Sequence, residues 1–162
     1  MHLILTTSNR HPMPIKLKDM PDHHDAELVL KLYELRTEPL MRESRGMLNK
    51  DFWPASFDDL QAWQKQEHPG NAAFRQVTSY WEMAYGMVKH GVLHGDFMLE
   101  SSGEGFFVFA RVKPYLTELR AGWSPRAFHN AEWVSQHSVF AKETLARYEK
   151  AVAGRLAVRA KG

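Results

Sequence analysis

Apolar side chains recur at helical spacing in the first part of the chain. Leu28, Leu32 and Leu35 lie three or four residues apart, which places them on one face of a helix. Asp22 precedes this segment and has a side chain suited to cap its first turn. Pro39 follows it, and a proline disfavours helical backbone at the residue before it. The pattern predicts a helix that begins after Asp22 and ends or kinks before Pro39.

Helical patterns resume beyond this proline. Residues 40–47 keep helical spacing, and we expect that helix to stop at Gly46. Ser56, followed three residues later by Asp59, has a spacing close to a capping box and predicts a short helix from residue 57 to about residue 66. The breaker cluster HPGN at residues 68–71 then ends it, and Asn71 is placed to cap the next helix.

The segment from Ala72 to His90 carries the widest apolar surface in the sequence. A helix that is apolar on so much of its circumference belongs at the centre of a fold. Gly91 follows it as a terminating glycine. The main apolar face contains Phe74, Val77, Trp81, Ala84, Tyr85 and Val88, and a second face beside it contains Tyr80, Met83 and Met87.

Residues 106–119 fit two structures. Their apolar positions suit a helix, but Phe106-Phe107-Val108-Phe109 also suits a buried strand, and periodicity alone does not decide between them. The length of the segment favours the helix, with a kink or a second segment beginning at Pro114. The alternative is an α+β fold in which a short N-terminal strand pairs with residues 106–112.

The last third of the chain predicts one very long helix or two shorter ones. Ser124 and Pro125 form a start signal, a serine cap followed by proline at the first helical position. A single helix over residues 125–158 would be about 50 Å long, whereas a domain of this size has a radius of gyration on the order of 15 Å. Either the polar, β-branched stretch 134–139 breaks the helix, or its C-terminal part projects.

These elements predict an all-α fold, a single-domain irregular bundle of about five to seven helices with a long C-terminal helix. Its 162 residues suit one domain. We expect an extended arm over residues 1–21, a helical core over 22–141, and a basic amphipathic helix and tail over 142–162.

Composition and charge exclude several classes of function. The absence of cysteine rules out disulfides, thiol nucleophiles and thiolate metal sites. The net charge of +2 is too small to suggest a nucleic-acid partner, although residues 142–162 carry +4 and the rest of the chain −2. The longest apolar run, residues 106–110, is too short to span a membrane, and the N-terminus lacks the features of a secretory signal. These observations predict a cytoplasmic protein without a membrane partner.

Histidine and carboxylate clusters do not form a convincing metal site. His90 and His94 have the spacing of a ligand pair, but Gly91 ends the helix between them. His23, His24 and Asp25 lie in the first turn of an exposed helix and are expected to be solvated polar surface. We therefore predict no metal and no cofactor. The loop at residues 101–105 has two glycines, but Glu104 within it and Glu100 beside it would repel phosphate.

Glu82 is the most interesting carboxylate, because it stands among aromatic and apolar side chains of the central helix. If its side of the helix faces water, Glu82 is part of an ordinary polar face, which is the more common case. If that side faces inward, burial raises its pKa and makes it a candidate acid or base. A ligand site would then combine Glu82 with Ser79, Trp81 and Tyr85; the sequence identifies no catalytic residue.

The C-terminal helix carries a second candidate surface, an apolar stripe suited to a partner helix. Its members are Leu145, Tyr148, Val152 and Leu156. We therefore expect a non-enzymatic protein–protein association module that forms a homo-oligomer. The alternative is a small-molecule binding protein or enzyme with a pocket near Glu82, Trp81 and Tyr85.

Three segments together resemble a known group of sequences. They are FRQVTSYWEMA at residues 74–84, HGVL at 90–93 and FFVFARVKPY at 106–115. The chain is similar in these segments, and over most of residues 22–150, to a group of uncharacterised small all-helical bacterial proteins. The resemblance implies a bacterial, cytoplasmic, all-helical protein and implies no activity.

Overall fold

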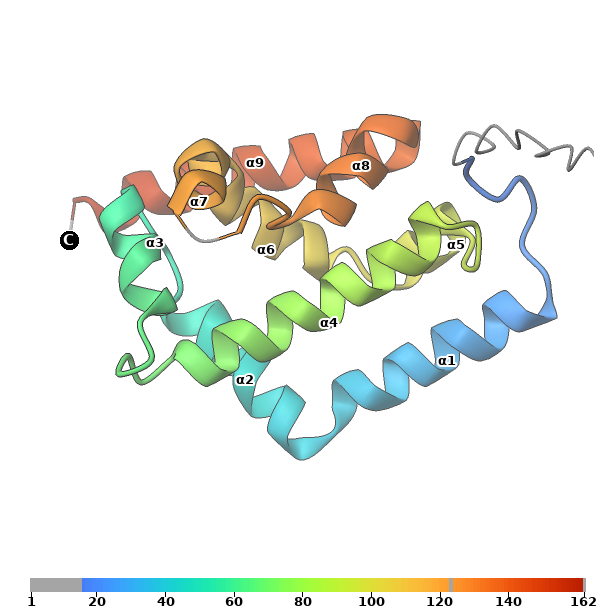
Figure 1. The fold of residues 1–162 in the computed structure, drawn as a ribbon, viewed down its shortest axis with the longest axis horizontal. Helices are drawn as coiled ribbons and strands as arrows, with labels where there is room; N and C mark the ends of the chain where they lie inside the picture. Colours follow the sequence, from blue (N-terminus) through green and yellow to red (C-terminus); the bar gives the residue numbers. More distant parts are fainter. Residues whose placement is uncertain (1–15, 123, 162) are drawn as a thin grey trace, which may run out of the picture.

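The computed structural model describes residues 16–122 and 124–161, and these form helices joined by short loops, with no strand among them (Figure 1). The all-α prediction is confirmed. The α-helices are α1 (His23–Thr37), α2 (Pro39–Asp51), α3 (Phe57–Gln64), α4 (Asn71–Lys89), α5 (Gly95–Ser101), α6 (Glu104–Val112), α7 (Leu116–Gly122), α8 (His129–His137) and α9 (Val139–Arg159), and the 3₁₀-helix η1 (Lys113–Tyr115) joins α6 to α7.

Helix α4 is the centre of the fold, as its apolar surface predicts. It packs against α2 on one side and α8 on another, while α6 packs against α9 (Figure 1). All six residues of its predicted main face are buried. The second face is covered less completely, because Tyr80 and Met87 are half-buried and Met83 is exposed.

The strand alternative is wrong for residues 106–112, which lie in α6. This helix can be apolar on nearly all sides because other elements surround it, so its sequence lacks the polar face that usually marks a helix. Pro114 ends α6 and lies in η1, as predicted. The strand expected near the N-terminus falls outside the described residues.

Local capping signals predict several helix ends correctly. The Asp22 carboxylate accepts hydrogen bonds from the backbone of His24 and Asp25, and Ser56 with Asp59 forms a complete capping box. Gly91 has a φ of 70°, the left-handed conformation expected of a glycine that ends a helix.

Three other predicted helix ends are wrong. Helix α2 continues through Gly46 to Asp51, because one glycine in a helix costs only about 1 kcal/mol. Asn71 is the first residue of α4 rather than its cap, and its side chain donates instead to the carbonyl of Trp63. Ser124 and Pro125 start no helix: residues 125–128 form turns, and α8 begins at His129.

The backbone at Phe128 explains the late start of α8. Phe128 has a left-handed conformation, with a φ of 53°, which is uncommon for an aromatic residue. Its ring is buried and stacks on the ring of Phe109 in α6. The turn therefore brings an aromatic side chain into the core, and this packing overrides the local start signal.

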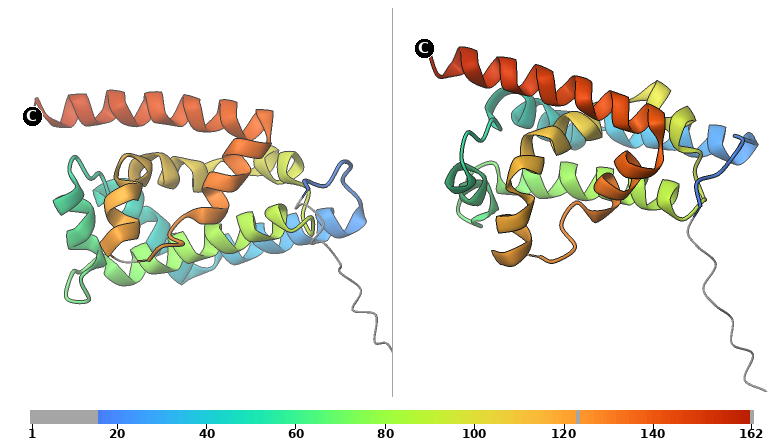
Figure 2. Two further views of the ribbon diagram at one scale, coloured as in Figure 1. Left: turned by 45° about the horizontal axis from the view of Figure 1, so that its top comes forward. Right: turned by 90° about the horizontal axis from the view of Figure 1, so that it is seen from above.

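Residues 125–159 contain two helices rather than one. Ser138, within the stretch expected to break the helix, ends α8 and caps α9 by accepting from the backbone of Ala141. Helix α9 lies alongside α6 and reaches the edge of the molecule at its C-terminal end (Figure 2). From residue 153 to residue 159 every residue except half-buried Leu156 is exposed, although the guanidinium groups of Arg155 and Arg159 lie over the ring of Trp53.

Candidate functional site

The carboxylate of Glu82 binds the backbone at the start of α8. Its two carboxylate oxygens accept hydrogen bonds from the backbone amides of Asn130, at 3.1 Å, and Ala131, at 2.8 Å. These are two of the amides that a helix leaves unpaired at its N-terminus. Phe128, at the capping position of α8, makes no side-chain cap. Glu82 therefore caps a helix that lies 48 residues further along the chain.

The surroundings of Glu82 act on its pKa in opposite directions. Partial burial raises the pKa, whereas the hydrogen bonds from Ala131 and Asn130 lower it, and burial dominates. The side chain thus lies neither on an open polar face nor in an apolar interior. Its geometry identifies a structural role, because both oxygens already have backbone partners.

A hollow of about 320 Å³ adjoins Glu82, and Ser79 lies on its wall. This hollow lies between α4 and the segment that leads into α8. Its remaining lining residues are Arg75, Thr78, Ser124, Arg126, Ala127 and Phe128. The structure therefore brings together Glu82 and Ser79, two of the four residues predicted for a ligand site.

Trp81 and Tyr85 lie on a different side of α4 from this hollow. Both are buried, and their rings stack with centroids 6.2 Å apart. Within the described residues, neither Trp81 Nε1 nor the Tyr85 hydroxyl has a hydrogen-bond partner, and burial raises the pKa of Tyr85 well above its usual value. Trp81 borders a cavity of only about 30 Å³, beside Leu32 and Met98. The predicted four-residue site is therefore divided between two places.

The glycines of the loop at residues 101–105 are packed tightly against aromatic rings. A side chain at Gly105 would place its Cβ 2.3 Å from the Tyr85 hydroxyl, and one at Gly103 would place it 2.4 Å from the Tyr148 hydroxyl. Only glycine fits at such distances. The two glycines therefore let α6 begin between α4 and α9.

The four residues predicted as an interface on α9 face the chain's own core. Leu145 and Val152 are buried, and Tyr148 and Leu156 are half-buried against the same core. While α9 stays docked on α6, this stripe is not available to a second molecule.

Asp25 corrects the prediction of solvated surface at the start of α1. Its side chain is fully buried, and its carboxylate accepts from Lys18 Nζ and from the backbone amides of Asp22 and His94, each at 2.7 Å. His94 is itself the cap of α5. Asp25 therefore fastens the start of α1 to the start of α5. The sequence shows only the capping half of this role, at a spacing of three residues from Asp22.

The histidines within residues 16–122 and 124–161 do not come together in a ligand set. In the part of the chain that the structure describes, no group of three or more His, Cys, Asp or Glu side chains could hold a metal ion. His94 caps α5 through Nδ1, and His137 stacks on Trp133.

Among the described helices, none has the length and apolar character needed to cross a membrane.

A third concave surface lies between α2, α6 and α9, and the sequence did not predict it. We call it the arginine hollow; its volume is about 470 Å³. Its residues come from four helices, the consecutive pair α1 and α2 and the more distant α6 and α9. They are Arg36, Arg45, Asn49, Glu104, Phe107, Tyr148 and Arg155.

One ion pair and two hydrogen bonds fix the edge of the arginine hollow. Arg45 Nε donates to both oxygens of Glu104, at 2.9 and 2.8 Å, and another Arg45 nitrogen donates to the carbonyl of Arg36. Arg36 in turn donates to the Ser102 hydroxyl. The Arg155 guanidinium lies over the ring of Trp53, 4.5 Å from its centroid. Three arginines and one glutamate give the hollow a formal charge of +2.

Arg111 lies in the interior beside Phe107. Arg111 as a residue is 2% exposed, and its guanidinium carbon lies within 5.4 Å of the ring centroids of Phe52, Trp53 and Phe107. It donates to the carbonyls of Phe107, Leu48 and Phe52, the last two at the end of α2. Burial lowers the pKa of Arg111 to about 9. Among the described residues it has no carboxylate partner, and its Nη2 makes no hydrogen bond.

No curated protein and no solved structure matches this chain. A family model matches residues 21–138, which run from the residue before the cap of α1 to the junction between α8 and α9. The match covers most of the chain, and the chain therefore belongs to the family described as Domain of unknown function (DUF4760).

Proposed function

We propose that this protein is a non-enzymatic association module that forms a homodimer through the outer face of α1. The observation that carries the proposal is a pair of large side chains, Leu30 and Tyr33, that the chain itself leaves exposed, in a row whose end members Ala26 and Thr37 are half-buried. Leu30 is 69% exposed and Tyr33 59% exposed, although both lie in the middle of a well-formed helix. With Ala26 and Thr37 they make a row at offsets of 0, 4, 7 and 11 residues, which is the spacing of one helix face.

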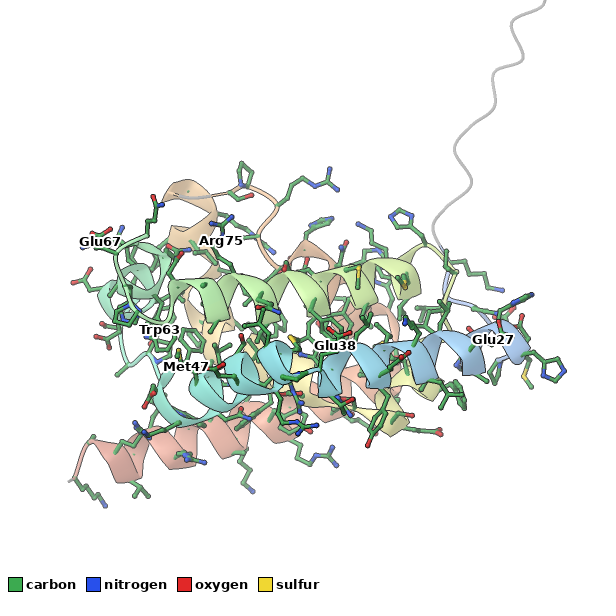
Figure 3. All side chains as sticks on the ribbon, turned by 90° about the horizontal axis from the view of Figure 1, so that it is seen from below. Glu27, Glu38, Met47, Trp63, Glu67 and Arg75 are labelled. Atoms are coloured by element: carbon green, nitrogen blue, oxygen red, sulfur yellow. The ribbon has the colours of Figure 1, made fainter. Side chains whose placement is uncertain are left out.

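The opposite side of α1 accounts for its attachment to the molecule. Within α1 only Asp25 and Leu32 are buried. The helix packs on α2 and α5, and α1 lies along the edge of the molecule nearest the viewer in Figure 3, between the labelled Glu27 and Glu38. An apolar row on a helix in this position is characteristic of an interaction surface rather than of a core.

The row is complementary to a second copy of itself in size. If two α1 helices pack antiparallel about a two-fold axis between Leu30 and Tyr33, each Leu30 meets the partner copy's Tyr33. The small Ala26 then lies opposite Thr37, so large side chains are matched in the centre and small ones at the ends. Such an isologous contact is the commonest symmetry of homo-oligomers.

The size of this surface predicts a weak dimer. One four-residue row supplies much less than the roughly 1,600 Å² of a standard stable interface. We therefore expect a monomer–dimer equilibrium that depends on protein concentration. Within this proposal the protein acts in the bacterial cytoplasm, as the sequence resemblance implies.

Sedimentation velocity over a range of concentrations tests this proposal. We expect Leu30→Glu to raise the dimer dissociation constant at least about tenfold, the equivalent of 1.4 kcal/mol, because it places a charge in the centre of the contact. Val158→Glu is the matched control, since Val158 is an equally exposed apolar residue on α9. A wild-type monomer at every concentration would overturn the proposal. Equal dimerisation by both variants would also overturn it.

The second candidate function is small-molecule binding in the hollow beside Glu82. The hollow itself favours it, since its lining offers Ser79, Thr78 and two arginines around a partly buried carboxylate. Because the α8 backbone occupies the Glu82 oxygens, a ligand would contact Arg75, Ser79 and Arg126 instead. Saturation-transfer NMR with a library of carboxylate fragments tests this function. We expect hits that Ser79→Phe, which fills the hollow, abolishes and that Ser101→Phe, a matched change outside it, keeps; fragments that bind all three proteins equally would exclude it.

A further inference from the structure

We infer that the arginine hollow binds a small soluble molecule through a phosphate monoester group. The inference does not rest on the proposed dimer, although the two surfaces meet at Arg36 of α1, which lines the hollow and whose guanidinium lies 5.5 Å from the ring centroid of Tyr33. It rests on the positive charge of the hollow, on the buried guanidinium of Arg111 behind Phe107, and on the ion pair that Glu104 makes with Arg45.

The rim of the hollow presents positive charge that other residues hold in place. Arg36 is held by Ser102, Arg45 by Glu104, and Arg155 by the ring of Trp53. Arg36 Nε is buried and has no hydrogen-bond partner among the described residues. Guanidinium groups fixed in this way have little conformational freedom left to lose, and their planar donor sets match phosphate oxygens.

The interior beside the hollow adds a charge without a counter-ion. Arg111 packs against Phe107, which lines the hollow, and its electrostatic neighbours include Glu104 and Arg155 of the same surface. Burying a guanidinium without a carboxylate is costly, and an anion bound nearby offsets part of that cost. Arg111 does not itself line the hollow, so its charge acts on an anion there from behind Phe107, whereas the unpartnered Nε of Arg36 belongs to a lining residue.

Glu104 does not repel phosphate in the way that its position in the sequence suggests. Arg45 contacts both of its oxygens, and Glu104 and Arg45 are both largely buried. The pair is close to neutral seen from the hollow, so Arg36 and Arg155 give the open surface a charge of +2. A phosphate monoester, which carries a charge of about −1.5 to −2 at pH 7, matches this better than a monocarboxylate.

The dimensions and the remaining residues set the class of ligand. A volume of about 470 Å³ lies within the range of small-molecule pockets, roughly 300–1,000 Å³. Phe107 and Tyr148 offer apolar ring surface for the organic part, and Asn49 offers an amide. These features fit a small organic phosphate rather than the backbone of a polymer.

Isothermal titration calorimetry of the full chain at low ionic strength tests the inference, with phenyl phosphate and inorganic phosphate as probes. We expect saturable binding of both. Arg155→Gln should weaken binding about three- to tenfold, the effect of one unit charge about 6 Å away in a solvated site. Lys150→Gln removes the same charge from an exposed position of α9 outside the hollow, and should change affinity less than about twofold.

A charge change of opposite sign separates the inference from a loss of structure. Glu104→Gln keeps the size of the side chain but removes the negative charge, and should tighten binding about three- to tenfold. A change that merely damaged the fold would weaken binding. If this variant does not fold, Arg155→Gln and Lys150→Gln still decide the question.

Three results would overturn the inference. The first is no saturable binding of either probe to the wild-type chain. The second is an equal loss of affinity in Arg155→Gln and Lys150→Gln, which would indicate attraction to net charge alone. The third is sedimentation with phosphatidic-acid vesicles in the absence of any binding to phenyl phosphate, which would assign the phosphate to a lipid surface.

Discussion

Asp25 and Arg111 are two of the three charged residues that are buried in the described part of the chain, the third being Lys89, and their charges are compensated differently. Asp25, at the joint between α1 and α5, is 0% exposed; Arg111, at the joint between α2 and α6, is 2% exposed. Each connects two helices that are far apart in the sequence. Asp25 has an opposite charge as its partner, whereas Arg111 has none among the described residues.

At the contact between α1 and α5, the negative charge of Asp25 is fully compensated by its partners. Lys18 Nζ supplies the opposite charge, and the amides of Asp22 and His94 supply two further donors. Burial raises the pKa of Asp25, but these hydrogen bonds together outweigh burial, so its pKa lies below the ordinary value of 3.8. The folded state therefore favours the charged form of this carboxyl.

At the contact between α2 and α6, the positive charge of Arg111 is compensated only in part. Carbonyl oxygens and aromatic rings surround the guanidinium, but these groups carry only partial negative charge. Burial consequently lowers the pKa of Arg111 to about 9. The difference teaches that a buried charge can be structurally necessary and still be poorly compensated. The poorly compensated one lies beside the hollow for which we infer an anionic ligand.

The largest expected effect is that of Asp25→Ala. This change leaves the backbone amides of Asp22 and His94 without their acceptor, while Lys18 keeps its ion pair with Asp22; two unsatisfied donors at about 1–3 kcal/mol each give a loss of about 3–5 kcal/mol. We expect a loss of this size in the free energy of unfolding, measured with urea. Asp19→Ala is the control, because Asp19 makes an exposed ion pair with Lys16, and it should change stability by less than about 1 kcal/mol.

A smaller loss is expected from Arg111→Met. The variant leaves the carbonyl of Phe52 without its donor, but it also removes the cost of burying an unpaired charge and keeps the apolar packing. We expect a loss of about 2 kcal/mol by the same measurement. If Arg111→Met proved more destabilising than Asp25→Ala, the contrast between a compensated and an uncompensated charge would be wrong.

The pH dependence of the Asp25 contribution follows from the sign of its shift. Because its pKa is lower in the folded state, this carboxyl stabilises the fold above the unfolded value of 3.8 and loses that effect as the pH falls through the folded value. The stability difference between the wild type and Asp25→Asn should therefore be constant from pH 7 to pH 5 and shrink below pH 4. Urea unfolding at these pH values measures it; a difference that grew on acidification would contradict the assignment.

Glu82 should show the opposite sign. Its pKa is raised, mainly by burial, so the carboxyl favours the folded state more when protonated. As the pH falls from 7 toward the raised value, the wild type should gain stability relative to Glu82→Gln, whose amide oxygen can still accept from α8. The change should be small, and parallel pH curves for the two proteins would exclude it.

The sequence predicted the features that depend on short spacings. The buried face of α4 and the caps at Asp22 and Ser56 each follow from residues within a few turns of one another. Asp25 has a role of both kinds: its bond to the Asp22 amide is a local spacing, but its bond to His94 joins residues 69 positions apart. Periodicity contains no information about the second bond, so the sequence predicted Asp25 to be a solvated surface residue.

The predicted four-residue ligand site is divided in the structure for the same reason. Glu82 and Ser79 share a hollow because the segment before α8 folds over them, while Trp81 and Tyr85 turn to another side of the same helix. Ser124 and Pro125 had a valid local start signal, but burial of Phe128 against Phe109 moved the helix start. In each case long-range packing decided between local alternatives of similar energy.

The smallest expected effect is the stabilisation of the folded state by a bound phosphate, which should differ between variants of Arg111 and Asp25. If phosphate binds in the arginine hollow, it stabilises the folded state by RT ln(1 + [L]/Kd), about 0.4 kcal/mol when the free concentration equals Kd. Part of this comes from compensating Arg111, so Arg111→Met should be stabilised less by phenyl phosphate than the wild type is. Asp25→Asn, whose changed charge is remote from the hollow, should gain as much as the wild type. Thermal unfolding at matched ionic strength measures these shifts, and equal shifts in all three proteins would show that Arg111 is compensated by the protein alone.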